Sequence, residues 1–254
     1  MTPQQIVLLA AAAAGGGAMN ALAGGGTLLT FPALLFMGES AIVANATSTV
    51  ALLPGAAASL AGYRREVATH RAWLRTFFLP SLLGGALGSF LLLRTPERTF
   101  ARLAPLLVLF ATVLFMIQGA VRRRAAAPHP GATPLRMGIA WALQFAVAVY
   151  GGYFGAGIGI LMLAVLGFLG LSNIHAMNGL KNFFGLAING VAAAYFIACR
   201  AVEWPAALVM IAGAILGGYG GARFARSIGQ DRARLAVVGI GLLVAALLAW
   251  QQWG

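Results

Sequence analysis

Long apolar stretches, separated by short gaps that hold nearly all the charges, follow one another from one end of this chain to the other. An apolar helix of roughly 20 residues can cross a bilayer, so most of these stretches have the length of a membrane span. Only 9% of the residues are charged, against about a quarter in water-soluble domains. We therefore predict an all-α polytopic membrane protein whose surroundings are the lipid bilayer. The eight stretches lie at 6–38, 40–62, 73–93, 103–120, 137–171, 172–199, 205–222 and 235–253.

Two of these stretches are too long for one span. The first, 6–38, and the fifth, 137–171, each exceed thirty residues, and a continuous helix of that length would overshoot a hydrocarbon core of about 30 Å. Glycine, which weakens helix interiors, interrupts both. Glycines spaced four apart, such as Gly84 and Gly88, have a second interpretation as sites of close helix packing. We expect 8 to 10 helices in all, with breaks at Gly15–Gly17, Gly24–Gly26, Gly151, Gly152, Gly155, Gly157 and Gly159.

The chain repeats itself at an interval of 133 residues. The glycine pairs at 84–85 and 217–218 match at this interval, and so do Asn45 and Asn178. Internal duplication with interrupted helices in corresponding positions is typical of secondary transporters, which bind substrate between the repeats. We predict two homologous halves: a first transmembrane repeat at 1–121, a cytoplasmic linker at 122–136 and a second transmembrane repeat at 137–254.

The arginines in the gaps test how the two halves are oriented. If every stretch crosses the bilayer once, the two sides carry nine and seven arginines, which is almost no bias. If the broken stretch in each half goes in and comes back, twelve arginines share one face against four. Cytoplasmic loops are enriched in Lys and Arg, so the second arrangement is favoured. It predicts inverted repeats with both termini outside; parallel repeats stay open as the alternative.

The positive charge does not indicate a nucleic-acid partner. The formal net charge is +12, but the arginines are scattered, with no basic helix or aromatic-interleaved patch. The single cysteine, Cys199, excludes an internal disulfide and a multi-cysteine metal site. The sequence contains neither H-E-x-x-H nor G-x-S-x-G. We therefore predict no nucleic-acid binding, no metal, no cofactor and no enzymatic activity.

Lys181 is the one basic residue deep inside an apolar stretch, with Asn178 and Asn182 close to it. A buried ammonium at membrane depth is costly unless it is paired or used, so an intramembrane charge indicates a functional site. The alternative is that the side chain reaches an interface from near a helix end. All five acidic residues fall in gaps or at stretch ends. We therefore expect Lys181 to face a small anionic substrate.

Polar residues also follow the glycine-rich break of the first half. They lie in the ANATST segment, which we expect to open a helix, as does the MNGLKN segment around Lys181. A helix N-terminus presents free N–H groups and positive partial charge that suit an anion. Helix capping and interhelical hydrogen bonding are the alternatives. The expected substrate-binding residues are Asn45, Thr47, Thr49, Asn178, Lys181 and Asn182, with Gly25, Gly26 and Gly157 letting backbone amides approach.

These segments resemble a known family. GGGTLLTFP and ANATST in the first half, GAGIGILM and MNGLKN in the second, and the duplication of four stretches are similar to the TauE/SafE sulfite exporter family over essentially the whole chain. The resemblance implies a multi-pass protein of the bacterial cytoplasmic (inner) membrane. It also implies transport of sulfite, sulfonates or related organosulfur anions, a substrate class that the residue spacing alone does not give.

On both grounds we predict a secondary transporter that moves small organosulfur or sulfur oxyanions by alternating access. Its site would lie where the broken helices of both halves meet. An anion channel is the alternative. A membrane-embedded enzyme is a weaker one, because it would need a nucleophile with its base or a metal cluster. Which anion is carried, in which direction, with which coupling ion, and whether the chain forms a homo-oligomer stay open.

Overall fold

The described part of the chain is built of helices without strands, as predicted. The computed structural model describes residues 1–22, 25–61, 63–125, 133–171, 173–228 and 230–253. The N-terminal part, residues 1–125, contains α1 (Pro3–Leu22), α2 (Thr27–Phe36), α3 (Ala41–Ala61), α4 (Arg64–Thr69), α5 (Arg71–Arg94) and α6 (Glu97–Ala125). The C-terminal part, residues 133–253, contains α7 (Pro134–Tyr153), α8 (Ile158–Phe168), α9 (Ile174–Ala198), α10 (Trp204–Ile228) and α11 (Gln230–Trp253).

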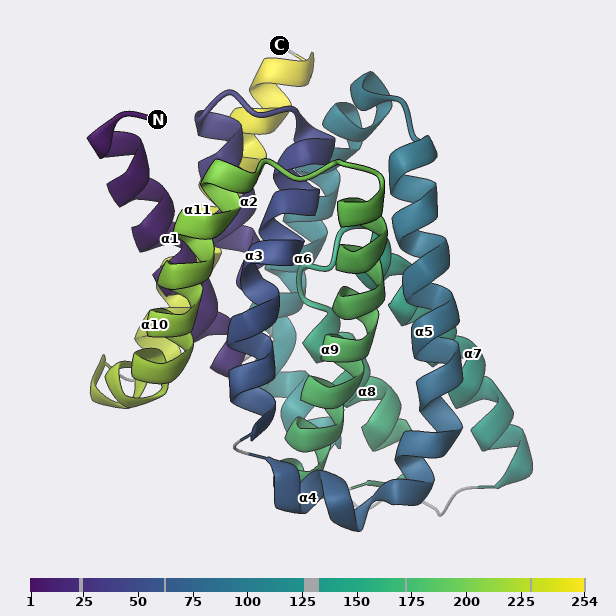
Figure 1. Ribbon diagram of the computed structural model, residues 1–254. Coiled ribbons are helices and arrows are strands. Elements are labelled where there is room, and N and C mark those ends of the chain that lie inside the picture. Colours follow the sequence, from purple (N-terminus) through teal and green to yellow (C-terminus); the bar gives the residue numbers. More distant parts are fainter. Residues whose placement is uncertain (23–24, 62, 126–132, 172, 229, 254) are drawn as a thin grey trace.

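Each part opens with a pair of helices that enters the bundle and returns. In Figure 1, α1 descends from the end that holds both termini and α2 runs back to it, whereas α7 and α8 enter and leave from the opposite end. The predicted breaks are confirmed, because helix stops before Thr27 and again before Ile158. Of the glycines expected at these breaks, Gly24 lies outside the described residues. The glycines at 15–17 and 151–152 lie inside continuous helices, so the expectation that they break the chain is wrong.

Those internal glycines instead allow neighbouring helices to approach closely. A Cβ atom on Gly217 of α10 would overlap the carbonyl oxygen of Ala14 in α1, and one on Gly17 would overlap the backbone of α10. In the same way Gly152 of α7 lies directly against the backbone of Gly85 in α5. Small residues at such crossings permit the van der Waals contact that holds membrane helices together. Close packing is therefore the role of glycine at these positions.

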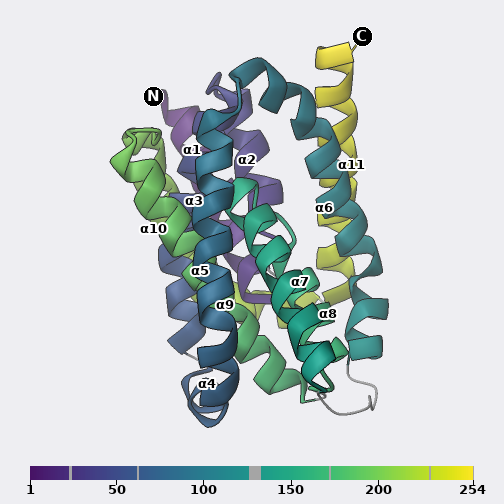
Figure 2. The same cartoon turned by 90° about the vertical axis from the view of Figure 1, so that its right-hand side faces the viewer.

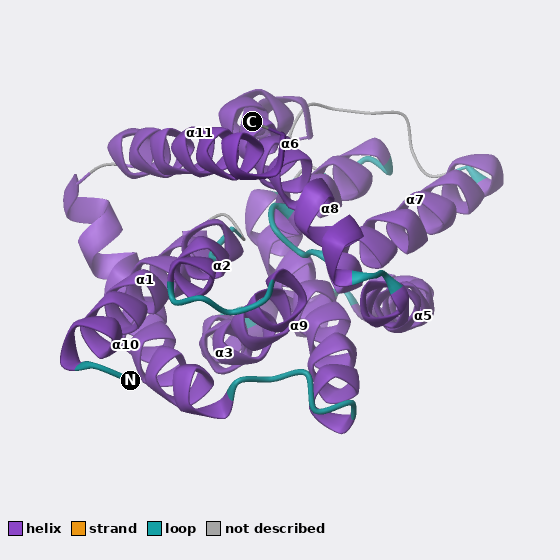
Figure 3. Cartoon of the chain, turned by 90° about the horizontal axis from the view of Figure 1, so that it is seen from above, coloured by secondary structure: helices purple, strands orange, loops and turns teal. Residues whose placement is uncertain are grey.

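Helices α3 and α9 contact each other in the middle of the bundle (Figure 1). On one side α10 packs on α1 and α3, and on the other side α5 packs on α7 and α9. Helices α6 and α11 pair along one face, which is clear in the view from above (Figure 3). Each part thus lends one helix to the other: α10 of the C-terminal part packs on α1 and α3, and α5 of the N-terminal part packs on α7 and α9.

Most of the arginine-bearing helix ends gather at one end of the molecule. Both termini lie at the upper end of Figures 1 and 2, while α4, the end of α6 and the start of α7 lie at the lower end. The end of α10 and the start of α11 also lie in the lower part of Figure 1. Helices α6 and α7 extend into both ends of the predicted linker, of which residues 126–132 lie outside the described part.

The outer surface of the bundle is apolar. Leu208, Leu216 and Leu243 are among the large hydrophobic side chains that are more than half exposed, as expected for a surface in contact with lipid. Within the described residues, four helical segments are long and apolar enough to cross a membrane: Ala41–Leu60, Arg71–Arg94, Glu97–Val121 and His175–Ala198. Shorter apolar segments are Thr27–Phe36, Ile158–Phe168, Trp204–Gly218 and Val237–Trp253.

Candidate functional site

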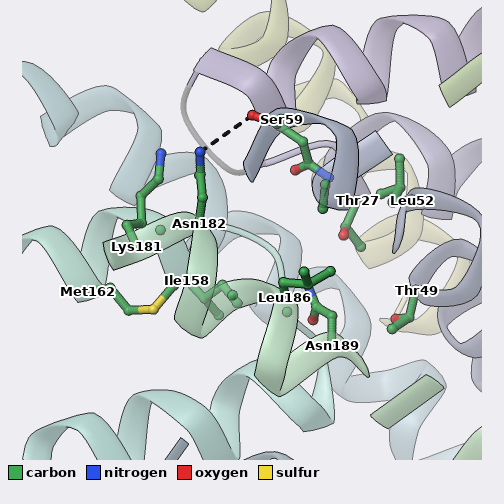
Figure 4. Close-up of a pocket in the computed structure, with 15 residues that line it drawn as sticks. Thr27, Thr49, Leu52, Ser59, Ile158, Met162, Lys181, Asn182, Leu186 and Asn189 are labelled. Carbon is green, nitrogen blue, oxygen red and sulfur yellow. Dashed lines mark hydrogen bonds between the residues drawn. The ribbon is translucent and has the colours of Figure 1, made fainter. Parts of the chain in front are cut away.

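A cavity lies where the two entering helix pairs meet α3 and α9 (Figure 4). Its volume is about 620 Å³, counting the part open to solvent. We call it the central cavity, and both parts of the chain form its wall. The N-terminal part supplies Asn20, Thr27, Thr49, Leu52, Ala56 and Ser59. The C-terminal part supplies Gly155, Ile158, Gly159, Met162, Lys181, Asn182, Gly185, Leu186 and Asn189.

Matching positions of α3 and α9 contribute to this wall. On each helix the lining residues are spaced by three, four and seven positions, which places them on one helical face. The repeat interval of 133 residues therefore brings equivalent positions to the same space from opposite sides. The matched pairs are Thr49 with Asn182, Leu52 with Gly185, and Ala56 with Asn189.

Lys181 is buried in the cavity wall, with 3% of its surface exposed. Its neighbour Asn182 donates a hydrogen bond from Nδ2 to Oγ of Ser59 at 3.4 Å, which joins α9 to α3. In Figure 4 the side chains of Lys181 and Asn182 extend in the same direction. No acidic residue is among the described residues that line the cavity. The wall thus combines an ammonium and an amide donor without a carboxylate, a set that favours an anion.

The turns of both helix pairs border the cavity. Thr27 is the first residue of α2, and in the preceding turn the Gly26 N–H donates to Oδ1 of Asn20 at 2.9 Å. Before α8, Gly155 and Gly157 have φ angles of +81° and +79°, a left-handed conformation that favours glycine. These glycines end α7 and start α8 within the bundle. The N-terminal ends of α2 and α8, which carry positive partial charge, therefore lie at the cavity.

A cluster of buried aromatic rings packs together on the side of the cavity toward the termini. The Phe31 ring lies edge-to-face against Phe154, with 5.4 Å between centroids, and at 6.4 Å from Phe100. All three side chains are at most 1% exposed. Phe100 belongs to the first turn of α6, which begins at the end that holds the termini. We call Phe31, Phe100 and Phe154 the aromatic cluster.

Asn45 lies one turn before Thr49 on α3 and is 1% exposed. The Asn45 Nδ2 donates a hydrogen bond to the carbonyl oxygen of Tyr153 at 3.0 Å. The Thr49 hydroxyl donates to the backbone carbonyl oxygen of Asn45 at 2.9 Å. Within the described structure, Oδ1 of Asn45 is buried and has no hydrogen-bond partner. An unpaired buried acceptor costs about 1–3 kcal/mol. This oxygen is therefore suited to accept a hydrogen bond from water or a ligand.

Three of the predicted site residues line the central cavity: Thr49, Lys181 and Asn182. The other six are not among the residues that line it. Thr47 accepts a hydrogen bond at Oγ1 from the Glu203 N–H at 3.0 Å, and Gly25 packs against the ring of Phe115. A role in substrate binding stays a prediction for all six of these residues, which are Asn45, Thr47, Asn178, Gly25, Gly26 and Gly157.

The expectation that the two polar segments open helices is wrong. Asn45 and Lys181 lie one and two turns inside α3 and α9. The first N–H groups of α3 bind the carboxylate of Glu97, and those of α9 bind Oδ1 of Asn173. The starts of α3 and α9 lie at opposite ends of the molecule, and the N–H groups at each start already have a hydrogen-bond partner. The helix starts at the cavity are those of α2 and α8 instead.

Sequence reasoning missed four polar residues of the cavity wall. They are Asn20, Thr27, Ser59 and Asn189. A helical spacing signal was present for one of them, because Asn182 and Asn189 stand seven positions apart and so share a face of α9. The others contribute through the turn of α1 and α2 and through the far end of α3, which only the fold brings to the cavity.

Comparison with known proteins gives the family. The family model for the sulfite exporter TauE/SafE matches residues 8–248 of this chain. The chain belongs to the TauE/SafE family. The match begins in α1 and ends in α11, so this transporter family accounts for both parts of the bundle.

Its curated relatives are named as transporters. A "probable membrane transporter protein" of Haemophilus influenzae is 27% identical over 241 residues, which covers 92% of this chain and 90% of that protein. The "probable membrane transporter protein YfcA" of Escherichia coli K12 is 26% identical over 249 residues, with 93% and 86% covered. The similarly named ORF9 protein of a Sinorhizobium species is 26% identical over 236 residues, with 90% and 87% covered. No solved structure matches significantly. The chain is a multi-pass membrane transporter of the TauE/SafE family.

Proposed function

We propose that this transporter carries a small sulfur oxyanion or organosulfonate through the central cavity. The observation that carries the proposal is the buried ammonium of Lys181 beside the Asn182 amide, in a wall whose described residues include no acidic side chain. Stripping water from an anion costs several kcal/mol or more, so several fixed donors are needed to offset that cost. The Asn189 amide and the Thr27 hydroxyl add donors to the same wall. The sulfite exporter name of the family favours sulfur oxyanions over other anions.

We propose further that the two halves are inverted repeats and that transport proceeds by alternating access. The two entering helix pairs come from opposite ends of the bundle, and the contacts of α10 and α5 are exchanged between the parts. This arrangement supports the proposal because inverted repeats place the substrate between them and let one half rock against the other. The aromatic cluster and the Asn45–Tyr153 hydrogen bond would form the barrier on the side toward the termini, and would separate when that side opens.

The sidedness of the membrane is proposed from charge. The helix ends with most of the arginines share one end of the molecule. Under the positive-inside rule this end faces the cytoplasm of a bacterial inner membrane, which places both termini outside. In this orientation the aromatic cluster closes the outer side.

Anion screening followed by flux measurement tests the proposed function. The purified transporter is heated in detergent with sulfite, sulfate, thiosulfate, sulfoacetate or acetate, and the stabilising anion is then loaded into proteoliposomes. We expect a sulfur anion to raise Tm more than acetate at equal concentration, and to show saturable flux with counterflow. Stabilisation by acetate alone would contradict the substrate class. Non-saturating flux without counterflow would indicate a channel instead.

A further inference from the structure

A groove on the outside of the bundle is separate from the central cavity. It lies between the ends of α6 and α8 and has a volume of about 710 Å³, counting the part open to its surroundings. Gly167 of α8 packs directly on Ala125 of α6, so the two helices touch at the floor of the groove. We call it the α6–α8 groove, and it is lined by Val121, Arg124, Ala125, Ala164, Gly167 and Phe168.

An apolar stripe on α6 leads into this groove. Its large side chains are each more than a third exposed and follow one another at helical spacings of three and four: Leu103, Leu106, Phe110, Val113 and Ile117. The next positions at these spacings, Val121 and Arg124, line the groove itself. The apolar span of α6 ends at Val121. Arg124 therefore lies one turn beyond the hydrocarbon, at the depth of lipid headgroups.

A second arginine stands beside the same groove. The guanidinium of Arg136, in the first turn of α7, lies over the ring of Phe168 with 5.3 Å to the ring centroid. Arg124 is exposed at the end of α6. Positive charge from two helices thus meets the polar end of an apolar groove. Basic pockets between membrane helices at this depth favour anionic headgroups.

We propose that the α6–α8 groove binds one anionic phospholipid, with its phosphate at Arg124 and one acyl chain along the apolar stripe of α6. The stripe and the arginine at its end match the two chemically different ends of a single lipid molecule. The proposal goes beyond transport of the anion and does not depend on it. The bound lipid braces α8 against α6, and α8 also carries Gly159 and Met162 of the central cavity.

Native mass spectrometry of the intact protein with phosphatidylglycerol and phosphatidylcholine of identical acyl chains tests this site. Arg124→Gln removes the proposed phosphate ligand. The matched control is Arg123→Gln, which makes the same charge change at an exposed neighbour that does not line the groove. Ala164→Trp keeps every arginine and fills the groove from its exposed edge.

We expect the unaltered protein and Arg123→Gln to retain one tightly bound phosphatidylglycerol. Arg124→Gln should weaken its binding by about tenfold or more, as for the loss of a charge-assisted hydrogen bond, and Ala164→Trp should displace it. Equal weakening by the two arginine variants would overturn the proposal in favour of diffuse surface charge. Equal retention of phosphatidylcholine would overturn the role of the phosphate charge. A dimer that Ala164→Trp dissociates would show that a second copy of the chain occupies the groove instead.

Discussion

Replacing Lys181 by methionine removes the ammonium from the central cavity while keeping a side chain of similar length. Lys181 is 3% exposed, so an apolar side chain is accommodated there without new contact with water. Methionine is unbranched, flexible and close to lysine in length, so it can fill the same space without leaving a large cavity. We therefore expect Lys181→Met to insert into the membrane and to keep its Tm.

The cost to anion binding follows from the interaction that is lost. A hydrogen bond to a charged group contributes about 1.5–3 kcal/mol. At about 1.4 kcal/mol for each factor of ten, Lys181→Met should raise the Kd of the transported anion by about 10- to 100-fold. The Asn182 and Asn189 amides of the wall stay in place, so binding weakens without disappearing. Flux at low substrate concentration should fall by the same factor.

The assay is anion uptake into proteoliposomes across a range of concentrations, with Tm measured on the same preparations. Arg98→Met is the matched control, because Arg98 is an exposed cation in the first turn of α6, outside the cavity wall. Its uptake should equal that of the unaltered protein. An unchanged concentration dependence in Lys181→Met would refute the assignment of the anion site to this cavity wall.

Three further predictions concern packing, pH and orientation. Gly217→Ala should lower stability by about 1–3 kcal/mol because the new methyl group overlaps the backbone of α1, whereas Gly138→Ala, with no atom within 4 Å of its Cβ position, should not lower Tm. Burial and the nearby Glu203 raise the pKa of the Glu39 carboxyl. The folded protein therefore favours protonated Glu39, and the stability that the protonated carboxyl contributes is lost as pH rises through the raised pKa. Glu39→Gln should therefore raise Tm at neutral pH and leave it unchanged below the ordinary value of 4.5; an equal effect at both pH values would contradict this cause. A cysteine at Arg123, in a background without Cys199, should react with an impermeant maleimide only in inside-out vesicles, and labelling from outside intact cells would reverse the proposed orientation.

Much of the fold could be predicted from hydropathy and length. A stretch too long for the bilayer has to break, and the breaks before Thr27 and Ile158 follow from that constraint. Which glycines make the break could not be predicted, because glycine serves both turns and close helix packing. Gly157 adopts a left-handed backbone conformation in the turn before α8, whereas Gly17 packs against the backbone of α10. Only the position of the neighbouring helix separates the two cases.

The candidate site was harder to predict because its wall comes from residues far apart in the sequence. Lys181 could be identified because a charge inside an apolar stretch is conspicuous. The cap of α3 could not, because Glu97 lies more than fifty residues from the N–H groups that it binds. That distant carboxylate occupies the helix start that the polar ANATST segment was expected to form. The Asn45 side chain donates a hydrogen bond to the carbonyl oxygen of Tyr153, which joins the N-terminal part of the chain to the C-terminal part.

The most direct test of the account is to locate a bound anion. Crystals of the transporter grown with selenite, the selenium counterpart of sulfite, would show the anion by anomalous scattering. We predict a peak in the central cavity, within hydrogen-bonding distance of Lys181 and Asn182. A peak at another place in the protein, or none in the cavity under conditions where selenite is transported, would contradict it.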